Sequence, residues 1–181
     1  MSLNLVRPFD GTTYASIDSI VGALNVIDVV HHEIHAGTHF MCTNLWDDVA
    51  DAGKASIWIE TGAGATPHLI AVANCAGDAW LHVFEDTVGT AGTSLTPYNN
   101  NRGNSGTSEA TLGYDGEIGS DGTTLFQALI PGGVNKYAGG GSGDSRVEWV
   151  LAPSTVYCVQ VTNKGGGVKD VSLALMWYEE S

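Results

Sequence analysis

Basic side chains are scarce in this 181-residue chain. It has 7 lysines and arginines against 20 aspartates and glutamates, for a formal net charge of −13. Such a surface repels phosphate backbones and anionic headgroups, so we expect neither nucleic acid nor a membrane as a partner. A cationic partner surface, or simple colloidal stability, fits this charge better.

Long apolar runs are also lacking. The longest apolar stretch, residues 19–30, is interrupted by Asn25 and Asp28 and is too short to cross a bilayer. Residues 1–18 show no positively charged segment followed by an apolar core. We therefore expect a protein that is made in the cytoplasm and not exported by the usual signal.

Paired cysteines and catalytic motifs are absent from the sequence as well. The three cysteines have no close pairing and each lies in an apolar context, so we expect buried free thiols; they are Cys42, Cys75 and Cys158. We find no nucleophile elbow, phosphate-binding loop or dinucleotide-binding glycine pattern. We expect a protein that is not an enzyme and that needs no cofactor.

From residue 26 onward, short runs of β-branched and aromatic residues alternate with glycine-rich turns. The predicted strands are residues 26–36, 38–46, 54–61, 68–77, 79–86, 93–99, 108–116, 123–131, 146–152, 154–163 and 170–180. Their regular spacing is typical of a β-sandwich or barrel. We predict an all-β domain over residues 26–181, preceded by an N-terminal arm or short helix in residues 1–25.

Two strand predictions are more specific. The run 170–180 has apolar side chains on both faces, with Val171 and Trp177 on one of them, so we expect it in the middle of a sheet. Pro153 predicts a turn between the run 146–152 and a return strand in the run 154–163.

Four of the six histidines lie within residues 31–40. If residues 26–36 form a strand, His31 lies about 13 Å from His35 and cannot share an ion with it. A turn at 36–38 would let His35 approach His39 across a hairpin. On a helix, by contrast, the i, i+4 pairs His31/His35 and His35/His39 would suit zinc.

The spacing of these histidines matches neither common enzyme pattern. There is no His-x-His pair of the cupin type, and Glu33 does not stand in the His-Glu-x-x-His order of zinc proteases. We interpret the histidines as structural and expect no metal. A cupin-like metalloprotein that uses the His31–His39 cluster, with His35 and His39 as ligands, stays open as an alternative.

Several segments, taken in order, resemble a family of bacteriophage virion proteins. The first is residues 25–40, with the turn His35-Ala36-Gly37-Thr38-His39-Phe40. The others are the Asn/Arg loop within 99–116, the run from Glu148 to Tyr157 within 146–163, and the closing Trp177-Tyr178-Glu179 within 173–181. The resemblance is spread over the whole predicted domain.

This resemblance implies a jelly-roll-like antiparallel β-sandwich on the outer surface of the phage head. Such proteins decorate or cement the capsid, commonly as homotrimers, so the implied partners are the major capsid protein and further copies of this chain. Relatives are richer in arginine in the Asn/Arg loop. Here the loop retains a single arginine, and the residues expected to contact capsid or a neighbouring subunit are Asn100, Asn101, Arg102 and Asn104.

The N-terminal arm is the other expected contact with the capsid. Its apolar residues suit burial under another chain, by β-strand addition for example; they are Leu3, Leu5, Val6 and Phe9. A phage tail or head-fibre protein that binds host glycan is the main alternative. It would need a shallow aromatic groove, for which the loop residues Tyr98 and Tyr137 are the sequence candidates.

Overall fold

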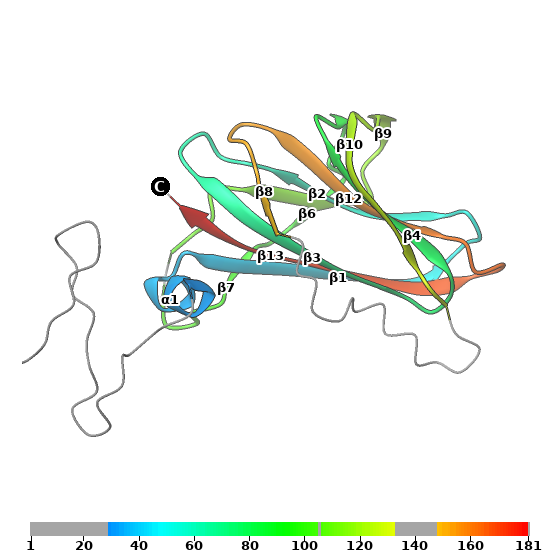
Figure 1. Cartoon of the computed structure of the whole chain (residues 1–181), viewed down its shortest axis with the longest axis horizontal. Helices are drawn as coiled ribbons and strands as arrows, with labels where there is room; N and C mark the ends of the chain where they lie inside the picture. Colours follow the sequence, from blue (N-terminus) through cyan, green and yellow to red (C-terminus); the bar gives the residue numbers. More distant parts are fainter. Residues whose placement is uncertain (1–28, 105, 133–147, 181) are drawn as a thin grey trace, which may run out of the picture.

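The computed structural model describes residues 29–104, 106–132 and 148–180. Over these ranges it is mostly β-strand, with one short helix, and every strand pair is antiparallel. Figure 1 shows two sheets packed face to face as a sandwich. The prediction of an all-β sandwich is confirmed.

The helix and the strands succeed each other along the chain as α1 (Val29–Ala36), β1 (His39–Val49), β2 (Lys54–Glu60), β3 (Thr66–Cys75), β4 (Ala79–Glu85), β5 (Val88–Gly89), β6 (Thr93–Leu95), β7 (Tyr98–Asn99), β8 (Thr111–Tyr114), β9 (Ile118–Ser120), β10 (Thr123–Ile130), β11 (Glu148–Val150), β12 (Val156–Asn163) and β13 (Lys169–Glu180).

Eight of these strands have jelly-roll connectivity. One sheet has the order β11-β3-β13-β1-β7 and the other β10-β4-β12-β2-β8-β6. Because β1 to β4 and then β10 to β13 alternate between the sheets, the four-strand cores β11-β3-β13-β1 and β10-β4-β12-β2 follow the order of a jelly roll. The remaining strands all lie in the connection between β4 and β10, where β7 and β8 extend the sheets beyond β1 and β2.

The core lies between the two sheets and is built from the alternate residues of each strand. The largest fully buried side chain is Trp177, and it packs beside Phe40 with ring centroids 5.9 Å apart. Its strand, β13, lies between β1 and β3, so the prediction of a central closing strand is confirmed. All three cysteines are buried and free, as expected.

One prediction about an individual segment is wrong: residues 29–36 form helix α1 instead of a strand. The predicted turn at Pro153 is present between β11 and β12, which belong to different sheets and do not pair. The predicted arm, residues 1–25, lies outside the described residues. The one described helix is too short to cross a membrane.

Candidate functional site

Helix α1 brings two of the clustered histidines together. The Nε2 atoms of His31 and His35 are 3.1 Å apart and both side chains are exposed. The strand-based separation of about 13 Å is therefore wrong, because residues i and i+4 share one face of a helix whereas a strand would separate them. The neighbouring His32 Nδ1 lies 2.9 Å from Glu33 Oε1.

A Schellman motif ends α1 at Gly37. The Gly37 N–H donates to the Ile34 carbonyl at 3.2 Å, and the Thr38 N–H donates to the Glu33 carbonyl at 3.1 Å. Gly37 has φ of +81°, which glycine adopts readily. The turn expected at residues 36–38 is present, but it closes a helix and leads into β1.

Asparagine amides from a distant loop complete this helix end. Asn101, Asn104 and Asn99 donate through Nδ2 to the carbonyls of His35, Ala36 and Gly37 at 3.2, 3.4 and 2.7 Å. These carbonyls belong to the end of the helix, where backbone acceptors lack partners within the helix. The loop thus holds α1 against the sandwich, across more than sixty residues of sequence.

The same side chains shape their own loop. Asn99 Oδ1 accepts from the Asn101 N–H, Asn101 Oδ1 from the Gly103 N–H, and Asn104 Oδ1 from the Gly106 N–H. Such side-chain-to-backbone bonds are typical of Asx turns. The asparagine-rich composition therefore has a structural cause. Each of these three side chains accepts a hydrogen bond from a loop N–H through Oδ1 and donates one to a carbonyl at the end of α1 through Nδ2.

The predicted contact residues in this loop divide into two groups. Asn101 and Asn104 use their amides within the chain, and Asn100 donates its N–H to the His39 carbonyl at 2.9 Å. Arg102 is exposed, and its guanidinium lies over the Tyr98 ring, 5.6 Å from the centroid. Tyr98 is 56% exposed. Contact of these residues with another chain stays a prediction; the apolar arm residues Leu3, Leu5, Val6 and Phe9 lie outside the described residues.

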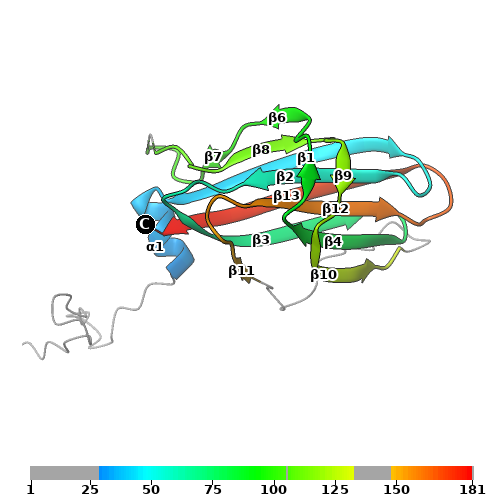
Figure 2. The same ribbon diagram turned by 90° about the horizontal axis from the view of Figure 1, so that it is seen from above.

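The closing strand joins the same end of the molecule. The Glu179 N–H donates to the Thr38 carbonyl at 3.1 Å. The Glu179 carboxylate accepts hydrogen bonds from the Ser108 hydroxyl, the Glu109 N–H and the Trp177 indole N–H. Figure 2 shows α1 and the C-terminal end of β13 side by side at one end of the sandwich.

A second polar cluster, which the sequence did not predict, links Glu148 of β11 to His68 of β3 and Tyr178 of β13. The Glu148 carboxylate lies 2.9 Å from His68 Nδ1 and accepts from the Tyr178 hydroxyl at 2.9 Å. The rings of Tyr178 and His68 stack with centroids 4.4 Å apart. Burial and the neighbouring Glu148 raise the pKa of Tyr178 to about 12. Only the register of three strands, β11, β3 and β13, brings these residues together.

Electrostatics at the helix end involve Glu33 and His39. Hydrogen bonds from Thr38 and His32 lower the pKa of Glu33. His39 is 5% exposed at the start of β1, and burial lowers its pKa, an effect that the nearby Glu33 partly opposes. His39 is therefore a neutral imidazole inside the junction, whereas His35 lies exposed on α1.

The potential metal ligands of the described residues can be compared with the metal-site alternative. Within the described part of the chain, no three His, Cys, Asp or Glu side chains are grouped so that they could hold a metal ion. The alternative that pairs His35 with His39 stays an untested prediction. The pair that the helix does form, His31 with His35, supplies two of the four ligands of a typical zinc site.

Comparisons of this chain with protein-family models, with curated proteins and with solved structures found no match.

Proposed function

We propose that this chain is a bacteriophage capsid decoration, or cement, protein, which binds the outer surface of the head as a homotrimer and stabilises the shell. The observation that carries the proposal is the convergence of the segments that resemble phage virion proteins. Residues of 25–40, 99–116 and 173–181 meet through hydrogen bonds at one end of the sandwich. Glu148 of the remaining segment bonds to Tyr178 of the closing strand.

We call this end, formed by α1, residues 98–104 and 106, and the last residues of β13, the helix–loop end. Most polar groups in its interior are paired within the chain, although His39 Nδ1 and Asn100 Oδ1 are buried without a hydrogen-bond partner among the described residues. Its outward side chains are the ones available to a partner. Tyr98 and Arg102 are prominent among them, and tyrosine and arginine are enriched at the energetic centres of protein interfaces. Residues 1–28 connect directly to α1, so the proposed arm would leave the domain at this end.

Two other features agree with a protein that binds and stabilises a capsid shell. The strong negative charge of the chain suits a soluble protein with a cationic partner surface. Apolar side chains are exposed on the edge strands β10 and β11, with Leu129 65% and Val150 62% exposed. Exposed apolar side chains on sheet edges fit contacts with further copies of the chain.

Immunogold electron microscopy of phage particles that carry this gene tests the proposal directly. We expect label over the head surface. Label on the tail would replace the proposal with the fibre alternative, and particles without label would overturn both.

Binding to heads stripped of this protein tests the assigned surface. Tyr98→Ala combined with Arg102→Ala should weaken co-sedimentation with such heads at least about tenfold. Val168→Ala is the matched control, because Val168 is 58% exposed in the connection before β13, away from the helix–loop end. Equal binding by the double variant and the control would remove Tyr98 and Arg102 from the contact.

A further inference from the structure

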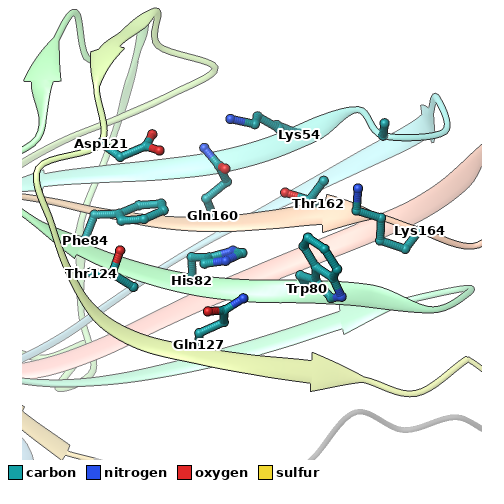
Figure 3. A pocket seen from close by; sticks show the side chains of 11 residues that line it. Lys54, Trp80, His82, Phe84, Asp121, Thr124, Gln127, Gln160, Thr162 and Lys164 are labelled. Atoms are coloured by element: carbon teal, nitrogen blue, oxygen red, sulfur yellow. The ribbon is translucent and has the colours of Figure 1, made fainter.

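The outer face of the β10-β4-β12-β2 sheet carries a hollow that the proposed capsid contact does not use. At one end of this face the ribbon β5–β9 lies over a small apolar cluster, in which Ile118 packs against Trp58, Phe84 and Cys158. Beyond that cluster the face is open, with a hollow of about 360 Å³. This volume lies within the range of small-molecule sites. Figure 3 shows its lining side chains rising from neighbouring strands.

Register explains why these side chains lie together. Gln127 of β10, His82 of β4 and Gln160 of β12 pair directly across the sheet, so their side chains lie in one row on the outer face. Trp80 of β4 and Thr162 of β12 form the next row. Hydrogen-bonded strands therefore hold most of the lining and fix its polar groups in place, whereas Ala52, Asp121 and Lys164 lie in connections at its border.

Two polar groups in this row lack partners among the described residues. Gln160 is only 2% exposed, yet its Nε2 makes no hydrogen bond, and the same holds for the buried His82 Nδ1. Burial lowers the pKa of His82, so its ring is neutral and can donate or accept. Buried polar groups without partners are costly and rare. Both atoms are themselves buried, so a bound molecule with hydroxyl groups supplies the missing hydrogen bonds once these side chains turn toward the hollow.

The hollow also has an aromatic platform and a basic rim. Trp80 is 42% exposed, and Lys164 Nζ lies 4.5 Å from the centre of its ring. Lys54 lies on another side of the hollow (Figure 3), so two of the chain's 7 basic residues border it. Asp121 is the one acidic residue in the lining. In a chain of net charge −13, this is a local excess of positive charge.

We propose that this hollow binds an acidic saccharide. The exposed part of the Trp80 indole packs against the apolar face of a sugar ring. The exposed Gln127 hydrogen-bonds its hydroxyl groups, and Gln160 and His82 do so once their side chains turn toward the hollow. Lys164 and Lys54 attract its carboxylate, which selects a uronic acid over a neutral sugar. The hollow lies apart from the helix–loop end, so this inference stands whether or not the chain binds capsids. If the protein is carried on a phage particle, the hollow gives that particle an affinity for acidic surface polysaccharide.

Isothermal titration with defined trisaccharides tests this assignment. The probes are the trimers of galacturonate, glucuronate and mannuronate, each compared with its neutral methyl ester. We expect at least one acid to bind with a millimolar or lower dissociation constant and its ester to bind about five to ten times more weakly. No heat with any acid at about 10 mM would overturn the proposal. Equal affinity for an acid and its ester would overturn the carboxylate selection.

Variants locate the binding on this face. Trp80→Ala and Lys164→Met should each weaken binding of the acid about tenfold. Leu45→Ala and Lys169→Met are the matched controls, because Leu45 is exposed on β1 and Lys169 starts β13, both in the other sheet. Gln160→Leu should also lose binding. Since Gln160 is buried, Gln127→Leu, at an exposed position of the same row, serves as the second test. Retained binding in Trp80→Ala and Gln127→Leu would show that the saccharide binds elsewhere.

Discussion

At the scale of single residues, Gly37 joins the helix end to the asparagine loop. Its φ of +81° disfavours other residues, and a Cβ there would lie 2.1 Å from Asn104 Nδ2. The Gly37→Ala change should therefore both strain the backbone and displace the amide that caps Ala36. We expect a loss of about 2 kcal/mol or more in the free energy of unfolding, measured by urea titration.

Gly166 provides the matched control for this prediction. It has φ of +65°, but a Cβ added there would meet no atom within 4 Å, so Gly166→Ala tests backbone strain alone. We expect a loss of about 1 kcal/mol there. Equal losses at the two glycines would show that contact between Gly37 and Asn104 adds nothing.

The buried His39 makes stability depend on pH. Because burial lowers its pKa in the folded chain, the unfolded chain binds a proton below about pH 6.5 that the folded chain does not accept. Stability from this group is thus present above that pH and is lost as the pH falls. Glu33, whose pKa is also lowered, adds a second loss only in more acidic solution, below its ordinary value of 4.5.

His39→Gln should remove part of this acid sensitivity. The urea midpoint of the variant should change less between about pH 7 and pH 5.5 than that of the unaltered chain. Some dependence should persist, because burial also lowers the pKa of His82. If both proteins lose stability equally over this interval, His39 does not titrate as its burial implies.

At the scale of elements, the sequence predicts strands better than their partners. Periodicity and turn residues locate nearly every strand of the two sheets, because alternation along a strand is a local property. The strand prediction fails at residues 29–36 since their valines and isoleucine favour a strand. What makes them helical is the Schellman end at Gly37 together with amides from Asn99, Asn101 and Asn104, and no local pattern reveals that contact.

The same limit applies to the candidate sites. The composition of the Asn/Arg loop singles it out in the sequence, but its bonds to α1 leave no local signal. The hollow on the outer face could not be predicted, because Trp80, Gln127 and Gln160 come from three strands and meet only through their register. Tyr98 and Tyr137 are the sequence candidates for the aromatic groove that the glycan-binding alternative needs. Tyr98 begins β7 and Tyr137 lies outside the described residues, whereas the exposed Trp80 indole lies within β4.

The closing strand gives the clearest prediction at this scale. Trp177 on β13 is fully buried, packs beside Phe40 and donates its indole N–H to Glu179 at 3.0 Å. Trp177→Ala should lower the free energy of unfolding by about 3–5 kcal/mol, because a large cavity forms in the core. Trp177→Phe keeps a ring against Phe40 and should lose less. Thermal or urea unfolding measures both, and an unchanged midpoint for Trp177→Ala would mean that β13 is not central to stability.

At the scale of the whole molecule, the sandwich and the N-terminal segment have separate roles in our proposal. Every strand of the two sheets lies within residues 39–180, and the connection between β4 and β10 extends both sheets beyond β1 and β2. A capsid-binding arm that leaves from the helix–loop end would add contacts with a neighbouring chain, by β-strand addition for example.

Deleting residues 1–20 separates these roles. The sandwich retains all of its core strands, so we expect the shortened chain to keep the unfolding midpoint of the full chain. We also expect light scattering to give each protein about three times the mass of its own chain, which is 18.9 kDa for the full chain, because the proposed trimer contacts lie on the sandwich. Binding to stripped heads should fall, since Leu3, Leu5, Val6 and Phe9 are removed. A shortened chain that binds heads as tightly as the full chain would refute the proposed arm. A monomeric mass for both proteins would refute the proposed trimer and leave the arm as the main source of affinity for the capsid.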